Sequence, residues 1–190
     1  MAHLLGAEQL RLSFPNRIVL DGVSLGLSDG DRVGVVGRNG DGKSSLLRLL
    51  AGRSEPDSGR VTVRGGVTVA MLDQTDSLVA DQTVGYSIVG DAPEHEWASD
   101  PRIRDVMAGL VADVPWDQRI DALSGGQRRR TALAALLVGD HDVMLLDEPT
   151  NHLDVEGVTW LARHLRARYA GGQGAFAVVT HDRWFLDEVT

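Results

Sequence analysis

Residues 37–44 constrain this chain more than any other stretch, because they read Gly-Arg-Asn-Gly-Asp-Gly-Lys-Ser. The pattern G-x-x-x-x-G-K-S is typical of loops that bind phosphate groups. Residues 32–36 before it form a mostly apolar run that suits a buried strand, and residues 45–51 after it have apolar side chains at helical spacing. The motif therefore lies between a predicted strand and a predicted helix, which is the context that its chemistry requires.

Glycine and lysine give this loop its chemistry. Gly37, Gly40 and Gly42 lack a Cβ atom, so the loop can curl and point its backbone N–H groups inward. Together with the positive end of the following helix, these groups form a nest for phosphate oxygens. In such loops the lysine reaches the β- and γ-phosphates and the serine ligates Mg²⁺. The nucleotide-binding residues predicted here are Gly37, Arg38, Asn39, Gly40, Asp41, Gly42, Lys43, Ser44 and Ser45.

Lysine usage singles out the same loop. Lys43 is the only lysine among the 19 basic residues, and all the others are arginines. A chain so biased toward arginine keeps lysine where a compact ammonium fits and a guanidinium fork does not. The alternative is a glycine-rich turn that binds nothing, which the restrictive motif and its context disfavour.

The composition bounds the class of protein. A length of 190 residues with 43% hydrophobic residues suits one domain, or one domain with a small subdomain. No cysteine is present, no apolar run approaches the ~20 residues that span a bilayer, and the start lacks the features of a secretory signal. We therefore expect a soluble cytoplasmic protein. The net charge of −8 argues against strong nucleic-acid binding by this chain alone.

Strand patterns flank a segment of different character. They occur at residues 7–14, 18–27, 60–63 and 67–72. From about residue 75 to 122, polar residues and proline dominate, with short helical stretches and the two tryptophans Trp97 and Trp116. We interpret this segment as a small helical insertion into the core, with each tryptophan as a packing anchor.

An acidic pair closes a further apolar strand. Residues 143–146 are fully apolar, and Asp147 and Glu148 follow them directly. The carboxyl end of a buried parallel strand is where Mg²⁺ and a general base belong in nucleotide hydrolases. The alternative is a strand end with two solvated carboxylates, which the phosphate loop upstream disfavours.

Four further positions are ambiguous when taken alone. The Phe14 ring can stack on adenine, or it can be a half-buried strand aromatic. Gln74 at a strand end can be a turn residue, and His181 after an apolar strand can be a structural residue. Ser124, with two glycines before the helix predicted at 128–138, marks a second place for an anion or a plain helix cap.

Taken in order, these pieces resemble the nucleotide-binding domain of the ABC ATPases. Residues 37–44 match the phosphate loop, and residues 143–148 match the Walker B strand with its glutamate. Phe14 fits the adenine-stacking position, Gln74 the Q-loop glutamine and His181 the switch histidine. The LSGGQ signature is matched by Leu123, Ser124, Gly125, Gly126 and Gln127.

The resemblance implies a fold and a division of the chain. The fold is an α/β P-loop NTPase with a parallel core sheet, an N-terminal antiparallel β-subdomain and an inserted helical subdomain. Residues 1–74 would hold the first part of the ATP-binding core, residues 75–127 the helical subdomain ending in the signature, and residues 128–190 the rest of the core. Because only one signature is present and the chain stops soon after His181, we expect a C-terminally incomplete, N-terminal domain of a longer protein.

Two strings indicate the branch of the family. Residues 148–154, Glu-Pro-Thr-Asn-His-Leu-Asp, and residues 180–187, Thr-His-Asp-Arg-Trp-Phe-Leu-Asp, resemble those of ABC-F proteins. Such proteins have no membrane domain, carry two ATPase domains in one chain, and many act on the ribosome as translation factors or antibiotic-resistance proteins. The D-loop residues Asn151, Leu153 and Asp154 would face the second ATPase domain, in the same chain or in a homodimer.

The resemblance also implies a reaction, the hydrolysis of ATP to ADP and phosphate. Ser44, Gln74 and Asp147 would hold Mg²⁺, and Glu148 would deprotonate the attacking water. The signature would close over ATP bound to the facing domain, so that each site has two halves. The predicted catalytic residues are Lys43, Gln74, Glu148 and His181. Two alternatives remain, the ATPase subunit of an ABC transporter and a nucleotide-dependent switch that does not hydrolyse ATP.

Overall fold

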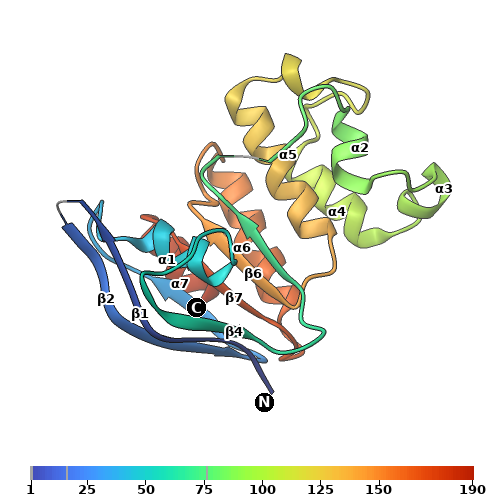
Figure 1. The fold of residues 1–190 in the computed structure, drawn as a ribbon. Coiled ribbons are helices and arrows are strands. Elements are labelled where there is room, and N and C mark those ends of the chain that lie inside the picture. The colour runs from blue at the N-terminus through green and yellow to red at the C-terminus, as the bar shows by residue number, and fades with distance from the viewer. Residues whose placement is uncertain (1, 16, 76) are drawn as a thin grey trace. The chain divides into compact units, whose positions relative to one another are not determined.

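The computed structural model describes residues 2–15, 17–75 and 77–190 (Figure 1). The chain divides into two compact units. One, here called the core unit, consists of residues 1–74, 141–149 and 162–190, and the other, the helical unit, of residues 75–140 and 150–161. Among the described residues, no helix is both long and apolar enough to cross a membrane.

The first layer of the core unit is an antiparallel sheet. It consists of β1 (His3–Phe14), β2 (Arg17–Ser28) and β4 (Ser58–Val63), in the order β2-β1-β4. Its leucines Leu5, Leu10 and Leu27 are fully buried. The β1–β4 register shifts between Glu8 and Arg11, and Gly59 opposite this bulge has a φ of 87°. A Cβ on Gly59 would lie 2.4 Å from the carbonyl oxygen of Gln9, so the bulge requires glycine there.

The second layer is a parallel sheet. It consists of β3 (Arg32–Val35), β5 (Val69–Leu72), β6 (Val143–Asp147) and β7 (Ala175–Val179), in the order β3-β7-β6-β5. β6 and β7 are buried along their whole length, as expected for apolar strands covered on both faces. Because all these strands run in one direction, their carboxyl ends meet at one edge of the sheet.

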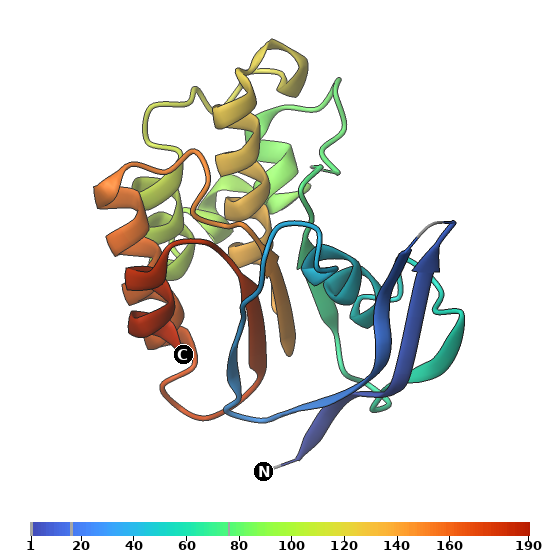
Figure 2. The ribbon, with the colours of Figure 1, turned by 90° about the vertical axis from the view of Figure 1, so that its left-hand side faces the viewer.

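A short helix, α1 (Lys43–Leu50), lies between the two sheets, as Figure 2 shows. Its leucines share one core cluster with leucines of the antiparallel sheet and with Val143 and Leu145 of β6. The helix follows the phosphate loop directly, so burial of its apolar face fixes the first turn at the carboxyl edge of the parallel sheet. Its buried residues are Leu46, Leu47, Leu49 and Leu50.

The opposite face of the parallel sheet carries α7 (Arg183–Val189). Val33 and Val35 pack on the cluster that contains α1, whereas the alternate residue Gly34 faces Leu186 of α7. A Cβ on Gly34 would lie 3.1 Å from Leu186 Cδ2, so the small residue lets the helix approach the strand closely. The second half of α6 (Val155–Arg168) also belongs to the core unit.

The helical unit consists of short helices with clear start signals. Thr83 and Asp100 accept hydrogen bonds from backbone N–H groups of the helices that follow them, and proline begins the second of these helices. The unit contains α2 (Val84–Val89), α3 (Glu94–Trp97), α4 (Pro101–Leu110), a 3₁₀ turn (Ile120–Ala122), α5 (Gly125–Val138) and the first residues of α6.

Tryptophan rings lie directly on glycines within this unit. A Cβ on Gly109 of α4 would be 2.2 Å from the ring of Trp160, which is 8% exposed. A Cβ on Gly85 of α2 would be 2.3 Å from the ring of Trp116. Trp116 also packs against Trp97, with ring centroids 4.5 Å apart. The predicted anchors Trp97 and Trp116 are therefore a half-buried pair, while the most buried tryptophan is one that the sequence reasoning did not single out.

The boundary placed at residue 127 from sequence differs from the observed division. α5 begins at Gly125 rather than at residue 128, and it runs unbroken to Val138 while packing against α2 and α4. A continuous helix whose apolar side packs on other helices stays with them, so the helical unit extends to residue 140. It also takes in residues 150–161, which the sequence division assigned to the core.

Candidate functional site

Most predicted site residues of the core unit lie at the carboxyl ends of its parallel strands, whereas Phe14 lies at the end of β1 in the antiparallel sheet. The phosphate loop follows β3, Gln74 comes two residues after β5, Asp147 ends β6 and His181 comes two residues after β7. Because these ends share one edge, residues that are far apart in sequence are brought to one place.

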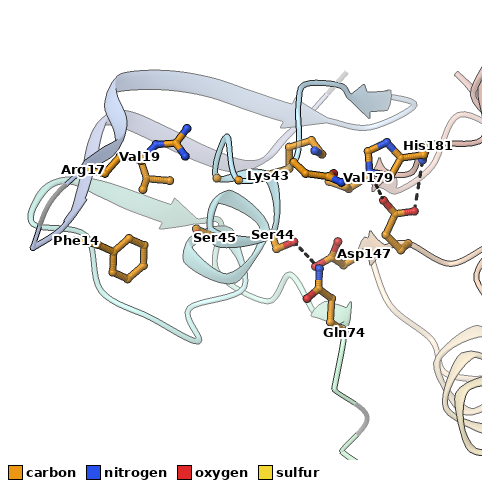
Figure 3. A pocket seen from close by; sticks show the side chains of 14 residues that line it. Phe14, Arg17, Val19, Lys43, Ser44, Ser45, Gln74, Asp147, Val179 and His181 are labelled. Atoms are coloured by element: carbon orange, nitrogen blue, oxygen red, sulfur yellow. Dashed lines mark hydrogen bonds and ion pairs between the residues drawn. The ribbon is translucent and has the colours of Figure 1, made fainter. Parts of the chain in front are cut away.

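A pocket of ≈ 570 Å³ lies at this edge (Figure 3). Phe14 lies at one end of it and His181 at the other, with Lys43 and Ser44 between them. Predicted residues that line the pocket are Phe14, Asn39, Gly40, Gly42, Lys43, Ser44, Ser45, Gln74, Asp147, Glu148 and His181. The other predicted loop residues, Gly37, Arg38 and Asp41, belong to the same loop but do not line the pocket.

The phosphate loop has the curled backbone that its glycines predict. Gly40 and Gly42 have φ values of 86° and 88°, which side chains rarely tolerate. A Cβ on Gly42 would lie 2.2 Å from Val19 Cγ1, so close packing against β2 also demands glycine. The Lys43 ammonium donates hydrogen bonds to the carbonyl oxygens of Gly37 at 2.9 Å and Arg38 at 3.0 Å. The loop thus holds its lysine between Phe14 and His181 in the pocket.

Oxygen-bearing side chains gather beside Ser44. The Gln74 amide donates from Nε2 to Ser44 Oγ at 3.0 Å, and the fully buried Asp147 lines the same pocket. A hydroxyl, an amide oxygen and one carboxylate fit Mg²⁺, which prefers oxygen ligands and leaves coordination positions for phosphate oxygens and water. The residues present are therefore suited to this metal.

Glu148 and His181 form a pair at the far end of the pocket. The His181 ring atom Nε2 lies 3.2 Å from Glu148 Oε1, and the His181 backbone N–H donates to Oε2 at 3.4 Å. The Glu148 side chain is 12% exposed and that of His181 58%. Glu148 has a φ of 50°, a left-handed conformation that costs energy in a residue with a side chain and occurs at functional sites. Its backbone N–H donates to the Val179 carbonyl at 2.7 Å, which holds that conformation.

The Phe14 ring is an exposed side chain of the pocket. It lies at the end of β1 and is 56% exposed, so it is not a core aromatic. An exposed ring at the rim of this pocket is suited to stacking on a base.

The signature and the D-loop lie in the helical unit. Ser124 caps α5, and Gln127 returns the bond in a capping box, with Ser124 N–H to Gln127 Oε1 at 3.1 Å and Gln127 N–H to Ser124 Oγ at 3.2 Å. Asp154 accepts from the Gly157 N–H at 2.8 Å at the start of α6. A Cβ on Gly126 would lie 3.6 Å from that of His152, so the two motifs are neighbours within the unit. Leu123, Gly125, Asn151 and Leu153 lie in the same two segments, each exposed or half-buried.

Three residues that line the pocket are not part of any motif. They are Arg17 and Val19 of β2 and Val179 of β7. Arg17 lies 3.4 Å from Asp41, whose carboxylate also accepts the Arg38 N–H at 2.8 Å. Of these three residues, only Val179 could have been expected at the pocket from the sequence, because it comes just before the segment that holds His181.

Comparisons with known proteins show the family of this chain. The family model described as ABC transporter matches residues 20–151. The chain is 36% identical to the energy-dependent translational throttle protein EttA of Mycobacterium tuberculosis, over 96% of this chain and 38% of that protein. It is 37% identical to the tylosin resistance ATP-binding protein TlrC of Streptomyces fradiae, over 93% of this chain and 39% of that protein.

A solved structure of the same fold is similar to this chain. The crystal structure of an archaeal ribosome recycling factor with a ribosomal stalk protein superposes with a TM-score of 0.85 and 28% identity, over 99% of this chain and 36% of that chain. The present chain thus spans well under half the length of these relatives. Its fold, its motifs and its relatives together show that the chain belongs to the ABC ATPase family, in the ABC-F branch.

Proposed function

We propose that this chain is an ATP-binding and ATP-hydrolysing domain that works on the ribosome as part of an ABC-F protein. The observation that carries the chemistry is the pocket at the edge of the parallel sheet. It combines a phosphate loop, a buried carboxylate beside Ser44 and the Glu148–His181 pair. No single motif supplies all three, and each serves a different step of phosphoryl transfer.

Binding would use both ends of the pocket. The Phe14 ring would stack on the adenine, and backbone N–H groups of the phosphate loop would donate hydrogen bonds to the phosphates. Lys43, which donates to two loop carbonyls here, would turn its ammonium to the β- and γ-phosphate oxygens. Ser44, Gln74 and Asp147 would hold Mg²⁺, whose role is to neutralise charge on the phosphates.

Hydrolysis would use the residues after β6 and β7. The Glu148 carboxylate would accept a proton from a water that attacks the γ-phosphorus, and the bond between that phosphorus and the β–γ bridging oxygen would break. His181 contacts Glu148 and would help to orient it and the γ-phosphate. The products are ADP and phosphate.

The signature and D-loop would serve a second ATPase domain. Ser124, Asn151 and Asp154 are exposed residues of the helical unit. We propose that this surface closes over ATP held by a facing domain, in the same full-length chain or in a homodimer. Loss of the γ-phosphate would then release the pair.

The relatives support the ribosome as partner. One is named a translational throttle protein, one a tylosin resistance protein, and one is a ribosome recycling factor. Because the chain spans 38% of the first of these, the partner is proposed for the full-length protein that carries this domain.

The test is co-sedimentation of the full-length protein with ribosomes. Glu148, and its counterpart in any second ATPase domain, is changed to Gln so that bound ATP is retained. We expect binding in ATP but not in ADP, and no binding in either nucleotide when Lys43→Met is added. If the protein retains ATP but does not bind ribosomes, the ribosomal role is wrong and the proposed ATPase activity stands. A partner of the transporter type would then be the alternative to test. Failure to bind ATP would overturn both.

A further inference from the structure

The segment that carries Gln74 is attached to α1 at two points. Gln74 itself donates to Ser44 Oγ, in the first turn of the helix, at 3.0 Å. Its neighbour Asp73 accepts hydrogen bonds from Arg48, in the last turn of the helix. Ser44 and Arg48 are four residues apart, so they lie one turn above each other on one face of the helix.

The contact between Arg48 and Asp73 is a two-pronged ion pair. Arg48 donates from Nε to Oδ2 at 3.0 Å and to Oδ1 at 3.2 Å, and from Nη2 to Oδ1 at 2.7 Å. Two parallel contacts fix the direction of the carboxylate as well as its distance. The Asp73 side chain is only 12% exposed, and Arg53 adds a contact to Asp73 at 3.6 Å and a hydrogen bond to the Met71 carbonyl at 3.1 Å.

The same carboxylate also holds the backbone of the next residue. Oδ1 of Asp73 accepts the Gln74 backbone N–H at 2.7 Å. Gln74 is therefore held at its main chain by Asp73 and at its amide by Ser44. It is also the last residue of the core unit before the chain passes into the helical unit at residue 75. An exposed glutamine at such a junction has no core packing of its own to fix it.

We propose that Arg48 and Asp73 are positioning residues that keep Gln74 within reach of the metal beside Ser44. The inference rests on the proposed function and adds two residues outside every motif of the family. A glutamine has three freely rotating side-chain bonds, so a ligand of this type binds a metal well only when its backbone and its tip are placed beforehand. The ion pair fixes the backbone, and the shared helix α1 ties that placement to the Ser44 hydroxyl.

If the ion pair of Arg48 and Asp73 served only the stability of the fold, its loss would have other consequences than the loss of a positioning pair. Its loss would lower the stability of the fold and weaken nucleotide binding equally with and without Mg²⁺. Loss of a positioning pair changes the response to Mg²⁺ specifically, and it has no further effect once the Gln74 side chain is gone. The Mg²⁺ dependence of nucleotide binding therefore separates the two roles.

The experiment uses the full-length protein and a fluorescent ATP analogue. Nucleotide binding is titrated with Mg²⁺ at constant ionic strength, and again in excess EDTA. The variants are Asp73→Asn, Arg48→Lys, Arg48→Met and Gln74→Ala. The control is Glu8→Gln on the antiparallel sheet, outside the pocket lining, which breaks an ion pair in which Arg60 donates from Nε at 3.0 Å and Nη2 at 2.7 Å to one oxygen, Oε2.

We expect Asp73→Asn and Arg48→Met to raise the Mg²⁺ concentration needed for half-maximal binding by about tenfold, a typical effect of removing a residue that supports a metal ligand. Nucleotide binding in EDTA should not change in these variants. The Mg²⁺ concentration for half-maximal binding should be intermediate in Arg48→Lys, between wild type and Arg48→Met, and it should equal the wild-type value in Glu8→Gln. Asp73→Asn should add nothing to Gln74→Ala.

Three results would overturn the inference. The Mg²⁺ concentration for half-maximal binding could be the same in Asp73→Asn and Arg48→Met as in wild type, or nucleotide binding by these variants could weaken as much in EDTA as in Mg²⁺. The effect of Asp73→Asn could also add in full to that of Gln74→Ala. If Asp73→Asn is too unstable to assay, Arg48→Lys carries the same test. A wild-type protein that does not bind the analogue with Mg²⁺ would instead overturn the proposed function itself.

Discussion

The core unit and the helical unit bring their motifs into place by different means. In the core unit, Gln74, Asp147 and His181 are far apart in sequence, and the edge of the parallel sheet brings them into one pocket, which Phe14 also lines from the end of β1. In the helical unit, the signature and the D-loop are local structures at the starts of α5 and α6, each closed by hydrogen bonds that span three residues. The residues that line the pocket all come from the core unit, whereas the starts of α5 and α6 carry exposed residues of the helical unit.

The two units also differ in how their interiors are packed. Two sheets with α1 between them give the core unit a continuous cluster of aliphatic side chains. In the helical unit, tryptophan rings packed on Gly109 and Gly85 add to buried aliphatic side chains such as Val84 and Ile120. Substitutions should therefore separate chemistry in one unit from packing in the other, and the following predictions run from the largest expected effect to the smallest.

The largest effect is expected at Glu148. Glu148→Gln removes the proposed base, and loss of a general base costs typically about 100- to 10,000-fold in rate. We expect kcat for ATP hydrolysis by the full-length protein to fall within that range, with the ATP dissociation constant and the urea midpoint unchanged. Glu55→Gln, on an exposed loop of the core unit, is the matched control. Turnover at the wild-type rate would remove Glu148 from the mechanism.

The second prediction concerns packing in the helical unit. Gly109→Ala places a methyl group against the Trp160 ring, and overpacking of this kind costs about 1–3 kcal/mol. Urea denaturation followed by tryptophan fluorescence should show the loss, whereas Gly65→Ala, which has no neighbour within 4 Å, should not. Nucleotide affinity at the core-unit pocket should be retained. A parallel loss of ATP binding would break the comparison, because it would make the pocket dependent on the helical unit.

The third prediction tests the exposed ring of the pocket. Stacking on a base is worth about 1–3 kcal/mol, and with Phe14 exposed at the rim we expect the lower end of that range for Phe14→Ala. The ATP dissociation constant should rise by about tenfold or less, while binding of inorganic tripolyphosphate should not change. If calorimetry shows that the binding of ATP and of tripolyphosphate weakens equally, Phe14 supports the shape of the loop and does not stack on the base.

The smallest effect is expected at an ion pair of the helical unit. The hydrogen-bonded Arg130 guanidinium holds the pKa of Asp113 below its ordinary value of 3.8. Because the pKa is lowered in the folded state, the stabilisation is fully present above 3.8 and is lost as the pH falls through the lowered folded value. Asp113 is 58% exposed, so screening limits the gain to below about 1 kcal/mol.

The measurement is the urea midpoint of wild type and Asp113→Asn across the acid range. Their midpoints should differ slightly at pH 7 and converge below the lowered pKa, while Asp91→Asn, at an exposed position, should follow wild type throughout. A difference that persists in strong acid would mean that the asparagine disturbs packing and that charge is not the cause.

Much of the core unit could be predicted from the sequence because its signals are local. The phosphate loop, the apolar strands and the acidic pair at the end of β6 each occupy a few consecutive residues, and parallel pairing places their ends together. Arg17 and Val19 were missed because only the packing of β2 against the loop brings them to the pocket. Arg48 and Asp73 were missed for the same reason, since their pairing is a contact across the fold that no spacing in the sequence reveals.

The helical unit was harder to predict. Its helices are short, so periodicity gives a weak signal, and the boundary at residue 127 cut through α5. The start of α5 at Gly125 follows from the capping box of Ser124 and Gln127, which overrides the low helix propensity of two glycines. The roles assigned to the site residues in both units stay predictions that the variants above address.

The isolation of Lys43 also makes the pocket chemically addressable. Reagents that acylate amines would find only this side chain and the N-terminal amine among the 190 residues. Its Nζ lies in the pocket that the phosphates would fill, so a bound nucleotide would shield it. The rate at which Lys43 acquires such a label, read by mass spectrometry, would therefore report how often the pocket is filled, in a domain where no other lysine obscures the signal.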